Sequence, residues 1–340
     1  MNKQIAVIGA GAAGLEAASI LDSMGLNVTL IEKSETLGGH IQQWYQLFPN
    51  RREGKEIVES LVKNINPSIP VHLNKEITSV QPFSGKFIIS ASDGWVINAD
   101  AVLITSGFDL FDARKKEEYG YTIYDHVITS ADLESYFSSD DGIKEFLGKS
   151  PARVGFVHCV GSRDEKVGNI YCSKVCCVTA VKQAIEIKEL FPYAEVYCFY
   201  MDLRMFGRQY EELYKEAQET YGIQFIRGRL SEASENKQGG IVLKVEDTLL
   251  GKPLKISVDL LVLMSGMVAP SATGSLRESI GLTKEEDGFL KPVDAHLAPN
   301  ISEVPGVFFA GACTGPKTIT DTLTDARSAA LAINEYVSRS

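Results

Sequence analysis

Short apolar runs alternate with amphipathic stretches along this chain, a pattern typical of strands and helices that form a parallel sheet. Near the N-terminus, the pattern predicts a strand over residues 4–8, a helix over 12–24 and a second strand over 28–31. Further along, it predicts a strand over 153–161, a helix over 173–191 and a strand over 194–200. The sequence therefore predicts an α/β fold with two dinucleotide-binding, Rossmann-like domains.

Two further stretches have helical spacing. The last predicted helix follows residue 317, and its apolar positions are Ile319, Leu323, Ala326, Ala330 and Ile333. The other covers residues 210–221, where the apolar and aromatic positions are Tyr210, Leu213, Tyr214, Ala217 and Tyr221. We expect the second stretch to pack against the core or against a partner.

Length, charge and composition exclude several classes of protein. The chain has 340 residues, enough for about two domains, and a net charge of −10 without a cluster of Lys and Arg. A nucleic-acid-binding role is therefore excluded, because such affinity depends on neutralising phosphates. Glycines interrupt the N-terminal apolar run, which is thus not a signal peptide, and no stretch is long and apolar enough to span a membrane. We expect a cytoplasmic protein, in which clustered cysteines are more often metal ligands or catalytic thiols than disulfides.

The first turn carries a complete dinucleotide-binding motif. Gly9, Gly11 and Gly14 form G-x-G-x-x-G between the first strand and the first helix, and Glu32 follows the second strand. The glycines permit a tight turn, close approach of the backbone to a pyrophosphate, and close packing of helix on strand. The helix N-terminus offers N–H groups to the phosphates, and Glu32 can accept from ribose hydroxyls.

Three stretches resemble flavoproteins that bind FAD in a two-dinucleotide-domain fold. They are the glycine pair Gly38–Gly39, the segment INADAVLITSGFD (97–109) and the segment VPGVFFAGACTGP (304–316). In the last segment, Ala312 stands where that type has an Asp that reaches the ribityl chain. The N-terminus of the helix after residue 317 would face the flavin and favour its reduced, anionic form. His40 is either a polar loop residue or a contact with the cofactor.

The turn of the second unit has no G-x-G-x-x-G and instead holds four of the six cysteines. Cys159 is expected at a strand end, and Cys172, Cys176 and Cys177 at a helix start. Because strand ends and helix starts meet at one edge of such a sheet, the four thiols can converge. Their C-x12-C-x3-C-C spacing is unlike that of zinc sites and suits an iron–sulfur cluster; a redox dithiol and core packing are the alternatives. The rebuilt turn argues against tight NAD(P)H binding.

The other cysteines and the missing motifs narrow these alternatives. Cys198 is expected to pack in mid-strand, and Cys313 lies in the segment expected to return past the flavin. Residues 34–50, where flavoenzymes of the glutathione-reductase type carry a cysteine pair, contain none. The C-x-x-C of thioredoxin reductases is not matched either.

Three segments together resemble HdrA, the flavin-containing component of heterodisulfide reductase, and its relatives. They are CVGSRDEKVGNIYCSKVCC, MDLRMFGRQYEELYKEAQETYGIQFIRGR and GPKTITDTLTDARSAA. The resemblance implies FAD and a [4Fe–4S] cluster whose ligands match Cys159, Cys172, Cys176 and Cys177. The chain lacks the ferredoxin-like modules of the methanogen versions, so it looks like a short form of sulfur metabolism. Such forms occur in the heterodisulfide-reductase-like sulfur-oxidising complex and in the quinone-interacting membrane-bound oxidoreductase of sulfate reduction.

The resemblance also implies an organisation and partners. The FAD-binding domain would comprise residues 1–112 and 265–340, with a crossover segment at 113–150, a second Rossmann-like domain at 151–264 and no C-terminal interface domain. The partners would be iron–sulfur proteins similar to HdrB and HdrC of heterodisulfide reductase, an indirectly attached membrane complex, and a second copy in a homodimer. The candidate FAD-binding residues are Gly9, Gly11, Ala12, Ala13, Gly14, Glu32, Lys33, Gly38, Gly39, His40, Ile77, Ser106, Gly107, Gly311, Ala312, Lys317, Thr318 and Ile319.

Three functions follow from these observations. The leading hypothesis is an electron-transfer flavoprotein within a larger complex, in which the cofactors carry the chemistry and the disulfide is reduced on a partner. The second is a stand-alone NAD(P)H-dependent disulfide reductase that uses two of the cysteines. The third is an assembly scaffold whose cofactors are structural.

Overall fold

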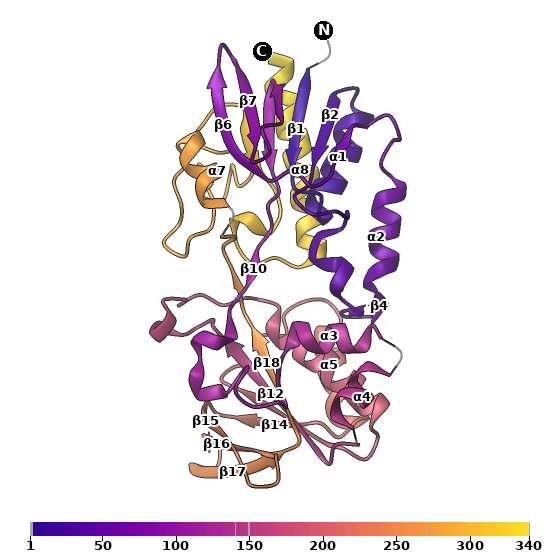
Figure 1. The fold of residues 1–340 in the computed structure, drawn as a ribbon, viewed down its shortest axis with the longest axis vertical. Coiled ribbons are helices and arrows are strands. Elements are labelled where there is room, and N and C mark those ends of the chain that lie inside the picture. Colours follow the sequence, from indigo (N-terminus) through magenta and orange to yellow (C-terminus); the bar gives the residue numbers. More distant parts are fainter. Residues whose placement is uncertain (1–2, 140, 149, 272, 340) are drawn as a thin grey trace. The chain divides into compact units, whose positions relative to one another are not determined.

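The chain divides into two compact units in a computed structural model that describes residues 3–139, 141–148, 150–271 and 273–339 (Figure 1). Within these ranges, the first unit is formed by the stretches 3–42, 54–109 and 268–339. The second unit is formed by 43–53 and 110–267. No helix within the described ranges is long and apolar enough to cross a membrane.

The first unit is built on a five-stranded parallel sheet in the order β20-β9-β1-β2-β5. Its strands are β1 (Gln4–Ile8), β2 (Asn27–Ile31), β5 (Val71–His72), β9 (Ala101–Ile104) and β20 (Val307–Phe309). β1 and β9 are almost wholly buried, as expected for parallel strands covered on both faces.

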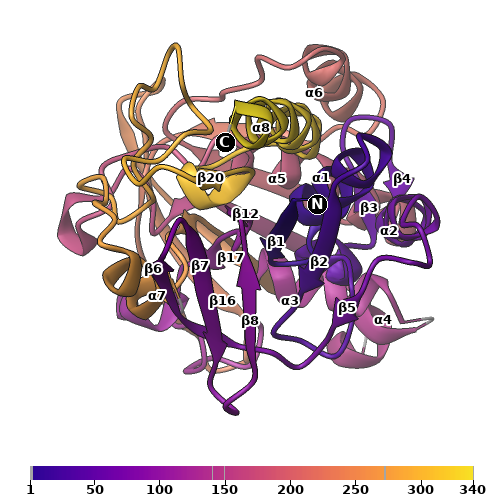
Figure 2. The same cartoon turned by 90° about the horizontal axis from the view of Figure 1, so that it is seen from above.

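Helices cover one face of this sheet and an antiparallel meander covers the other. Helices α1 (Ala12–Ser23) and α8 (Ile319–Arg339) pack side by side, and α2 (Gly54–Lys63) lies next to α1 (Figure 2). The meander consists of β6 (Ile77–Phe83), β7 (Lys86–Ala91) and β8 (Val96–Ala99), and α7 (Thr273–Ile280) packs against β6. The meander, α7 and the adjoining sheet face share one apolar core.

The second unit repeats the plan with the sheet order β11-β18-β12-β13-β14, again all parallel. These strands are β11 (Val127–Thr129), β12 (Arg153–Val160), β13 (Glu195–Tyr200), β14 (Gln224–Arg227) and β18 (Leu260–Ser265). Helices α3 (Ser130–Phe137), α4 (Gly142–Leu147), α5 (Cys176–Leu190) and α6 (Tyr210–Glu219) contribute to one apolar core with this sheet.

A second antiparallel meander belongs to this unit, formed by β15 (Leu230–Glu235), β16 (Ile241–Asp247) and β17 (Lys252–Val258). The remaining elements are short. They are β3 (Gln46–Leu47), β4 (Arg52–Glu53), β10 (Asp109–Leu110), β19 (Met267–Val268) and the 3₁₀ turns η1 (Gly39–Gln43), η2 (Ala113–Lys115), η3 (Glu117–Tyr119), η4 (Glu165–Val167) and η5 (Ala312–Thr314).

The predicted elements are confirmed with small changes at their ends, except at the second helix start. That helix begins at Cys176, because Lys174 has a φ of +63°, a left-handed conformation that a helix cannot continue through. The prediction that Cys172 lies at the helix start is therefore wrong, and Cys172 lies in the preceding loop.

The two other helical stretches pack as predicted, with differences at their ends. In α6, Leu213 and Ala217 are buried, and Tyr221 lies beyond the end of the helix but still packs against the core. In α8, Ala326, Ala330 and Ile333 are buried, whereas Ile319 and Leu323 are only half-buried.

Candidate functional site

The first glycine turn of the first unit is closed by direct backbone contacts. Gly9 has a φ of +105°, and a Cβ there would lie 2.5 Å from the carbonyl oxygen of Thr105. A Cβ on Gly14 would lie 1.8 Å from the carbonyl oxygen of Gly9. These two glycines are therefore required by the turn itself, which brings the start of α1 against the end of β1.

Gly11 differs from these two because its missing Cβ leaves open space. A Cβ there would meet no atom closer than the Cα of Gly39, at 4.0 Å. Gly11 precedes the first turn of α1, whose opening residues Ala12 and Ala13 carry N–H groups with no intrahelical acceptor. A bare backbone at a helix N-terminus fits an approaching pyrophosphate.

Glu32 is buried at the end of β2 with its carboxylate held in place. Its Oε2 accepts from the backbone N–H of Ala10 at 2.6 Å, and its Oε1 accepts from the N–H and Oγ of Ser34 at 2.9 and 2.8 Å. A carboxylate has about four lone-pair positions, so acceptor capacity remains for ribose hydroxyls. The next residue, Lys33, is exposed.

The glycine pair 38–39 lies beside this turn. Gly38 donates its N–H to the carbonyl oxygen of Ala10 at 2.8 Å and forms a parallel bridge with Gly11. A Cβ on Gly39 would come within 3.1 Å of the Cα of Gly11. The two glycine-rich segments, about 28 residues apart in the sequence, thus run side by side with bare backbone between them.

The segment after β9 closes over the glycine turn through a residue that sequence reasoning missed. The hydroxyl of Thr105 donates to the carbonyl oxygens of Ile8 and Gly9, at 2.9 and 2.7 Å. Its neighbours Ser106 and Gly107 are half-buried, and Gly107 has a φ of +69°. A threonine directly after an apolar strand was the available signal.

Two other predicted FAD contacts, His40 and Ile77, make contacts within the protein itself. His40 bonds through Nε2 to the carbonyl oxygen of Phe108 at 2.8 Å, and the two rings stack with centroids 4.3 Å apart. These contacts fit the loop role that the sequence left open for His40. Ile77 begins β6 and is buried in the core between the meander and the sheet.

The loop after β20 is organised by Asp325 of α8, which the sequence reasoning also missed. Its carboxylate accepts from the N–H of Gly311 at 2.8 Å and pairs with Nζ of Lys317 at 3.1 Å. Lys317 also donates to the carbonyl oxygen of Gly311 at 2.9 Å. Gly311 is itself tightly placed, because a Cβ there would lie 2.9 Å from Cβ of Ala13.

This loop leads into the N-terminus of α8. Ala312 is buried in η5, and its methyl group offers no hydrogen bond where the resembling flavoproteins have a carboxylate. Thr318 caps the helix, since its Oγ1 accepts from the N–H of Asp321 at 3.1 Å. Helix α8 then begins at Ile319. Open glycine backbone, a fixed carboxylate and two helix N-termini in one unit fit a bound FAD.

Three of the four clustered cysteines of the second unit meet between β12 and α5. The Cys176 side chain is hydrogen-bonded with the sulfurs of both Cys159 and Cys177, and all three residues are buried. The sulfur of Cys172, which is half-buried, accepts from the N–H of Lys174 at 3.3 Å. All six cysteines are free thiols. Across the described ranges, no three His, Cys, Asp or Glu side chains are grouped so that they could hold a single metal ion.

Two of the three gathered thiols, those of Cys159 and Cys177, have a lowered pKa, which favours the thiolate. Hydrogen bonding from Cys176 lowers the pKa of Cys159 to about 7, against the opposing effect of burial. Hydrogen bonding from Cys176, with help from His158, lowers the pKa of Cys177 to about 4, again against burial. The same two hydrogen bonds raise the pKa of Cys176 well above its usual value. Thiolate is the form that attacks disulfides and binds metals.

Polar groups around these thiols lack ordinary partners. Buried atoms without a hydrogen-bond partner include both ring nitrogens of His158, Nη1 of Arg163 and Oγ of Ser162. Arg163 interacts with the sulfur of Cys159, and the amide of Ser162 bonds to the carbonyl oxygen of Cys159. Unpartnered donors beside the three gathered thiols fit a group rich in sulfur acceptors, such as an iron–sulfur cluster.

The other two cysteines, Cys198 and Cys313, are both buried. Cys313 donates to the carbonyl oxygens of Ala310 and Ile104, and burial raises its pKa to about 12. A buried protonated thiol of this kind is a packing residue. Cys198 is fully buried in β13, as predicted.

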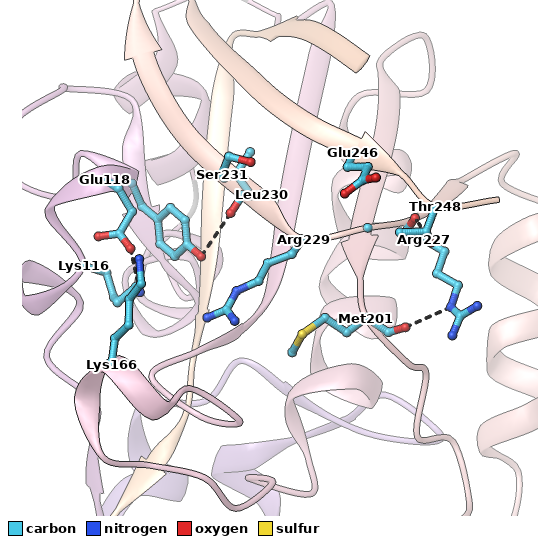
Figure 3. A pocket seen from close by; sticks show the side chains of 12 residues that line it. Lys116, Glu118, Lys166, Met201, Arg227, Arg229, Leu230, Ser231, Glu246 and Thr248 are labelled. Carbon is cyan, nitrogen blue, oxygen red and sulfur yellow. Dashed lines mark hydrogen bonds and ion pairs between the residues drawn. The ribbon is translucent and has the colours of Figure 1, made fainter. Parts of the chain in front are cut away.

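A cavity of about 590 Å³ opens in the second unit near the ends of β13 and β14 (Figure 3). Its lining includes four basic side chains, and Figure 3 shows Arg229 between the Lys116–Glu118 pair and Arg227. Lys116 pairs with Glu118 and with the buried Asp164, at 2.6 and 2.8 Å, and Arg229 also pairs with Asp164 at 2.9 Å. Much of the positive charge of this cavity is therefore already neutralised.

Comparison with known families gives a match over most of the chain. Residues 3–140 and 177–330 match the family described as "Pyridine nucleotide-disulphide oxidoreductase". The stretch between the two matched ranges holds Cys159, Cys172 and Cys176, so the match is interrupted where the second dinucleotide turn is replaced.

Curated relatives include the A components of one kind of enzyme. The chain is 33% identical over 98% of its length to that component of the "H(2)/formate:CoB-CoM heterodisulfide,ferredoxin reductase" of Methanococcus maripaludis, of which it covers 64%. It is 44% identical over 69% of its length to that component of the "H(2):CoB-CoM heterodisulfide,ferredoxin reductase" of Methanothermobacter thermautotrophicus, of which it covers 36%. The chain thus spans less than two thirds of these relatives.

Solved structures share the fold. Thioredoxin reductase of Lactococcus lactis superposes with a TM-score of 0.70 at 16% identity, over the full length of both chains. Thioredoxin reductase of T. acidophilum superposes with a TM-score of 0.68 at 19% identity, over 99% of each chain.

Proposed function

This chain belongs to the pyridine nucleotide-disulphide oxidoreductase family and is a flavin-dependent oxidoreductase, and on that premise we propose a more specific role. It serves as an FAD- and [4Fe–4S]-containing electron-transfer component of a heterodisulfide reductase-like complex in dissimilatory sulfur metabolism. Its partners are iron–sulfur proteins like HdrB and HdrC, and it works as a homodimer. The names of its relatives, which are the A components of heterodisulfide reductases, support this assignment.

One observation carries the proposal: the second dinucleotide turn is replaced by a cysteine segment. Cys159, Cys176 and Cys177 already meet, two of them with a lowered pKa, and His158 and Arg163 beside them have buried nitrogens without a hydrogen-bond partner. Cys172 stands on the loop that leads into the same helix and supplies the fourth ligand. Four cysteines are the ligand set of [2Fe–2S] and [4Fe–4S] clusters alike, and the resemblance to heterodisulfide reductase favours the latter.

In the first unit, the protein holds and orients the flavin. The open backbone from Gly11 to Ala13 binds the pyrophosphate, and the fixed carboxylate of Glu32 binds a ribose. The N-terminus of α8, capped by Thr318, would offer its N–H groups to the flavin, and Lys317 and Asp325 fix the loop that precedes it. When bound, FAD exchanges electron pairs and the cluster exchanges single electrons, which is the chemistry that amino-acid side chains lack.

The stand-alone disulfide reductase remains the second candidate because of the same thiols. Hydrogen-bonded free cysteines with a lowered pKa could cycle between dithiol and disulfide. That function needs a hydride donor, and the second turn lacks the glycine motif that would hold a nicotinamide nucleotide. We therefore expect neither NADH nor NADPH to reduce the bound flavin rapidly in an anaerobic stopped-flow experiment.

Iron, acid-labile sulfide and FAD measured in anaerobically purified protein separate the two candidates. Electron transfer through a cluster predicts about four irons and four sulfides per FAD, and an EPR signal after reduction. Cys172→Ser and Cys177→Ser should each lose that signal, whereas the matched controls Cys198→Ser and Cys313→Ser should keep it. Little iron, together with two thiols that titrate reversibly to a disulfide, would instead establish the reductase.

A further inference from the structure

The cavity of the second unit (Figure 3) lies where open α/β sheets usually bind their ligands, outside the carboxyl ends of parallel strands. Met201 directly follows β13, and Arg227, the last residue of β14, is followed by Gly228 and Arg229. The volume of about 590 Å³ is within the usual range of small-molecule sites. None of the residues that line the cavity is a proposed flavin contact or cluster ligand.

This cavity is basic, although the chain as a whole is acidic. The charged side chains that line it are Lys116, Lys166, Arg227, Arg229, Glu118 and Glu246. The buried carboxylate of Asp164 contacts two of these cations without lining the cavity. Even when Asp164 is included, the cations outnumber the carboxylates by one, whereas the whole chain has a net charge of −10. The cavity therefore attracts anions against the overall charge of the protein.

The carboxylate of Asp164 organises three of the four basic residues. Its Oδ2 pairs with Lys116 at 2.8 Å and with Arg229 at 2.9 Å, and its Oδ1 accepts from the backbone N–H of Lys166 at 3.1 Å. Lys116 and Asp164 are each only 2% exposed. Apolar residues in place of such a buried pair are often equally stable, so the fold does not require the pair. Lys116 also pairs with Glu118, which leaves one of its three N–H donors for a ligand.

The two remaining cations, Lys166 and Arg227, are exposed and weakly paired. Lys166 forms no ion pair in the part of the chain that the structure describes. Arg227 pairs with Asp202 at 3.5 Å, but the carboxylate of Asp202 is closer to Arg163, at 2.7 Å. Both cations can therefore donate charge-assisted hydrogen bonds to an anion in the cavity.

We propose that this cavity binds the phosphate group of a small molecule, a role separate from the electron transfer proposed above. The cations come from separate segments of the chain, with Arg229 between Lys116 and Arg227 in Figure 3. A phosphate suits this arrangement, because its terminal oxygens accept hydrogen bonds from several directions. Tyr119 and Leu230 add apolar surface to the lining, which favours an organic phosphate over inorganic phosphate.

Isothermal titration calorimetry of the anaerobically purified holoprotein tests this proposal, with inorganic phosphate and glycerol 3-phosphate as probes at constant ionic strength. We expect each probe to bind saturably, with one molecule per chain. Tighter binding of glycerol 3-phosphate identifies an organic phosphate as the ligand, and equal affinities identify free phosphate. Malonate is the dicarboxylate control, and its binding more tightly than both phosphates would contradict the assignment to phosphate.

Variants of exposed residues locate the binding in the cavity without disturbing the buried pair. Lys166→Gln and Arg227→Gln each remove one charge-assisted hydrogen bond and should weaken phosphate binding about tenfold. Glu246→Gln removes a repelling carboxylate and should strengthen binding about threefold. Lys237→Gln is the matched control, because it removes an exposed charge that does not line the cavity, and it should change nothing. The proposal is overturned if neither phosphate binds saturably, or if Lys166→Gln and Lys237→Gln have equal effects.

Discussion

Replacing Gly14 with alanine tests whether the first glycine turn is as tight as its contacts indicate. The added Cβ would lie 1.8 Å from the carbonyl oxygen of Gly9 and 2.9 Å from Oγ1 of Thr105. Cβ atoms essentially never approach closer than 3.0 Å, so helix α1 must move away from β1 by at least about 1.2 Å. The obstacle is backbone, which cannot rotate aside as a flexible side chain could.

The size of the effect follows from two opposing terms. Overpacking a buried contact costs about 1–3 kcal/mol and occasionally more. Alanine in a helix interior recovers up to about 1 kcal/mol relative to glycine. Because the obstacle is backbone, the overpacking cost should lie at the upper end of its range, and we expect a net loss of about 2 kcal/mol, which lowers the melting temperature of a unit of this size by roughly 4–8 °C. Because Gly11 moves with the helix, the affinity for FAD should also fall.

Thermal unfolding and the ratio of flavin to protein absorbance measure the two consequences. The matched control is Gly274→Ala in α7 of the same unit, where a Cβ would meet no atom within 4 Å. That variant should keep its FAD and gain about 0.5–1 kcal/mol from better helix propensity. If Gly14→Ala retains a full complement of FAD and melts with the wild type, the close approach of α1 to β1 is not what the turn requires.

Two further predictions concern buried charges of the second unit. Burial, with the nearby carboxylate of Glu134, raises the pKa of Glu186 to about 8. The folded protein therefore keeps a proton on Glu186 that the unfolded chain loses above the ordinary pKa of 4.5. The free energy of unfolding consequently falls as the pH rises from about 4.5 to about 8. Glu186→Gln should remove about 2–4 kcal/mol of that pH dependence in melts from pH 5 to 8, and parallel curves for both proteins would contradict this. Asp164→Ala leaves the buried Lys116 with one carboxylate fewer and should cost about 3–5 kcal/mol in urea unfolding. Adding Lys116→Met should restore part of this loss, and strictly additive effects would show that the pair is uncoupled.

The sequence determined the parts of this protein that depend on local pattern. Apolar periodicity was enough to place β1, α1, β2, β12 and β13, because helices and strands bury faces with different repeats. The spacing of Gly9, Gly11 and Gly14 together with Glu32 predicted the first dinucleotide turn, since each has a steric or hydrogen-bonding task within about 25 residues of chain.

Tertiary structure alone decided which distant side chains meet. Asp325 and Thr105 fix the loops proposed to hold the flavin from positions far along the chain, and although both lie in segments that resemble known flavoproteins, their hydrogen-bond partners are visible only in the folded chain. Cys172 was expected at a helix start, but the left-handed Lys174 delays the helix by one turn. Backbone conformations of this kind are maintained by surrounding contacts, and hydrophobic periodicity does not record them.

The cysteine segment depends partly on local sequence and partly on tertiary structure. Its four cysteines are visible in the sequence, and their spacing already separated them from zinc sites. That Cys159 meets Cys176 depends on a shift in the register of β12 and on the left-handed backbone of Cys159 itself. The alternating pattern of the strand records neither feature, because that pattern assumes regular pleating.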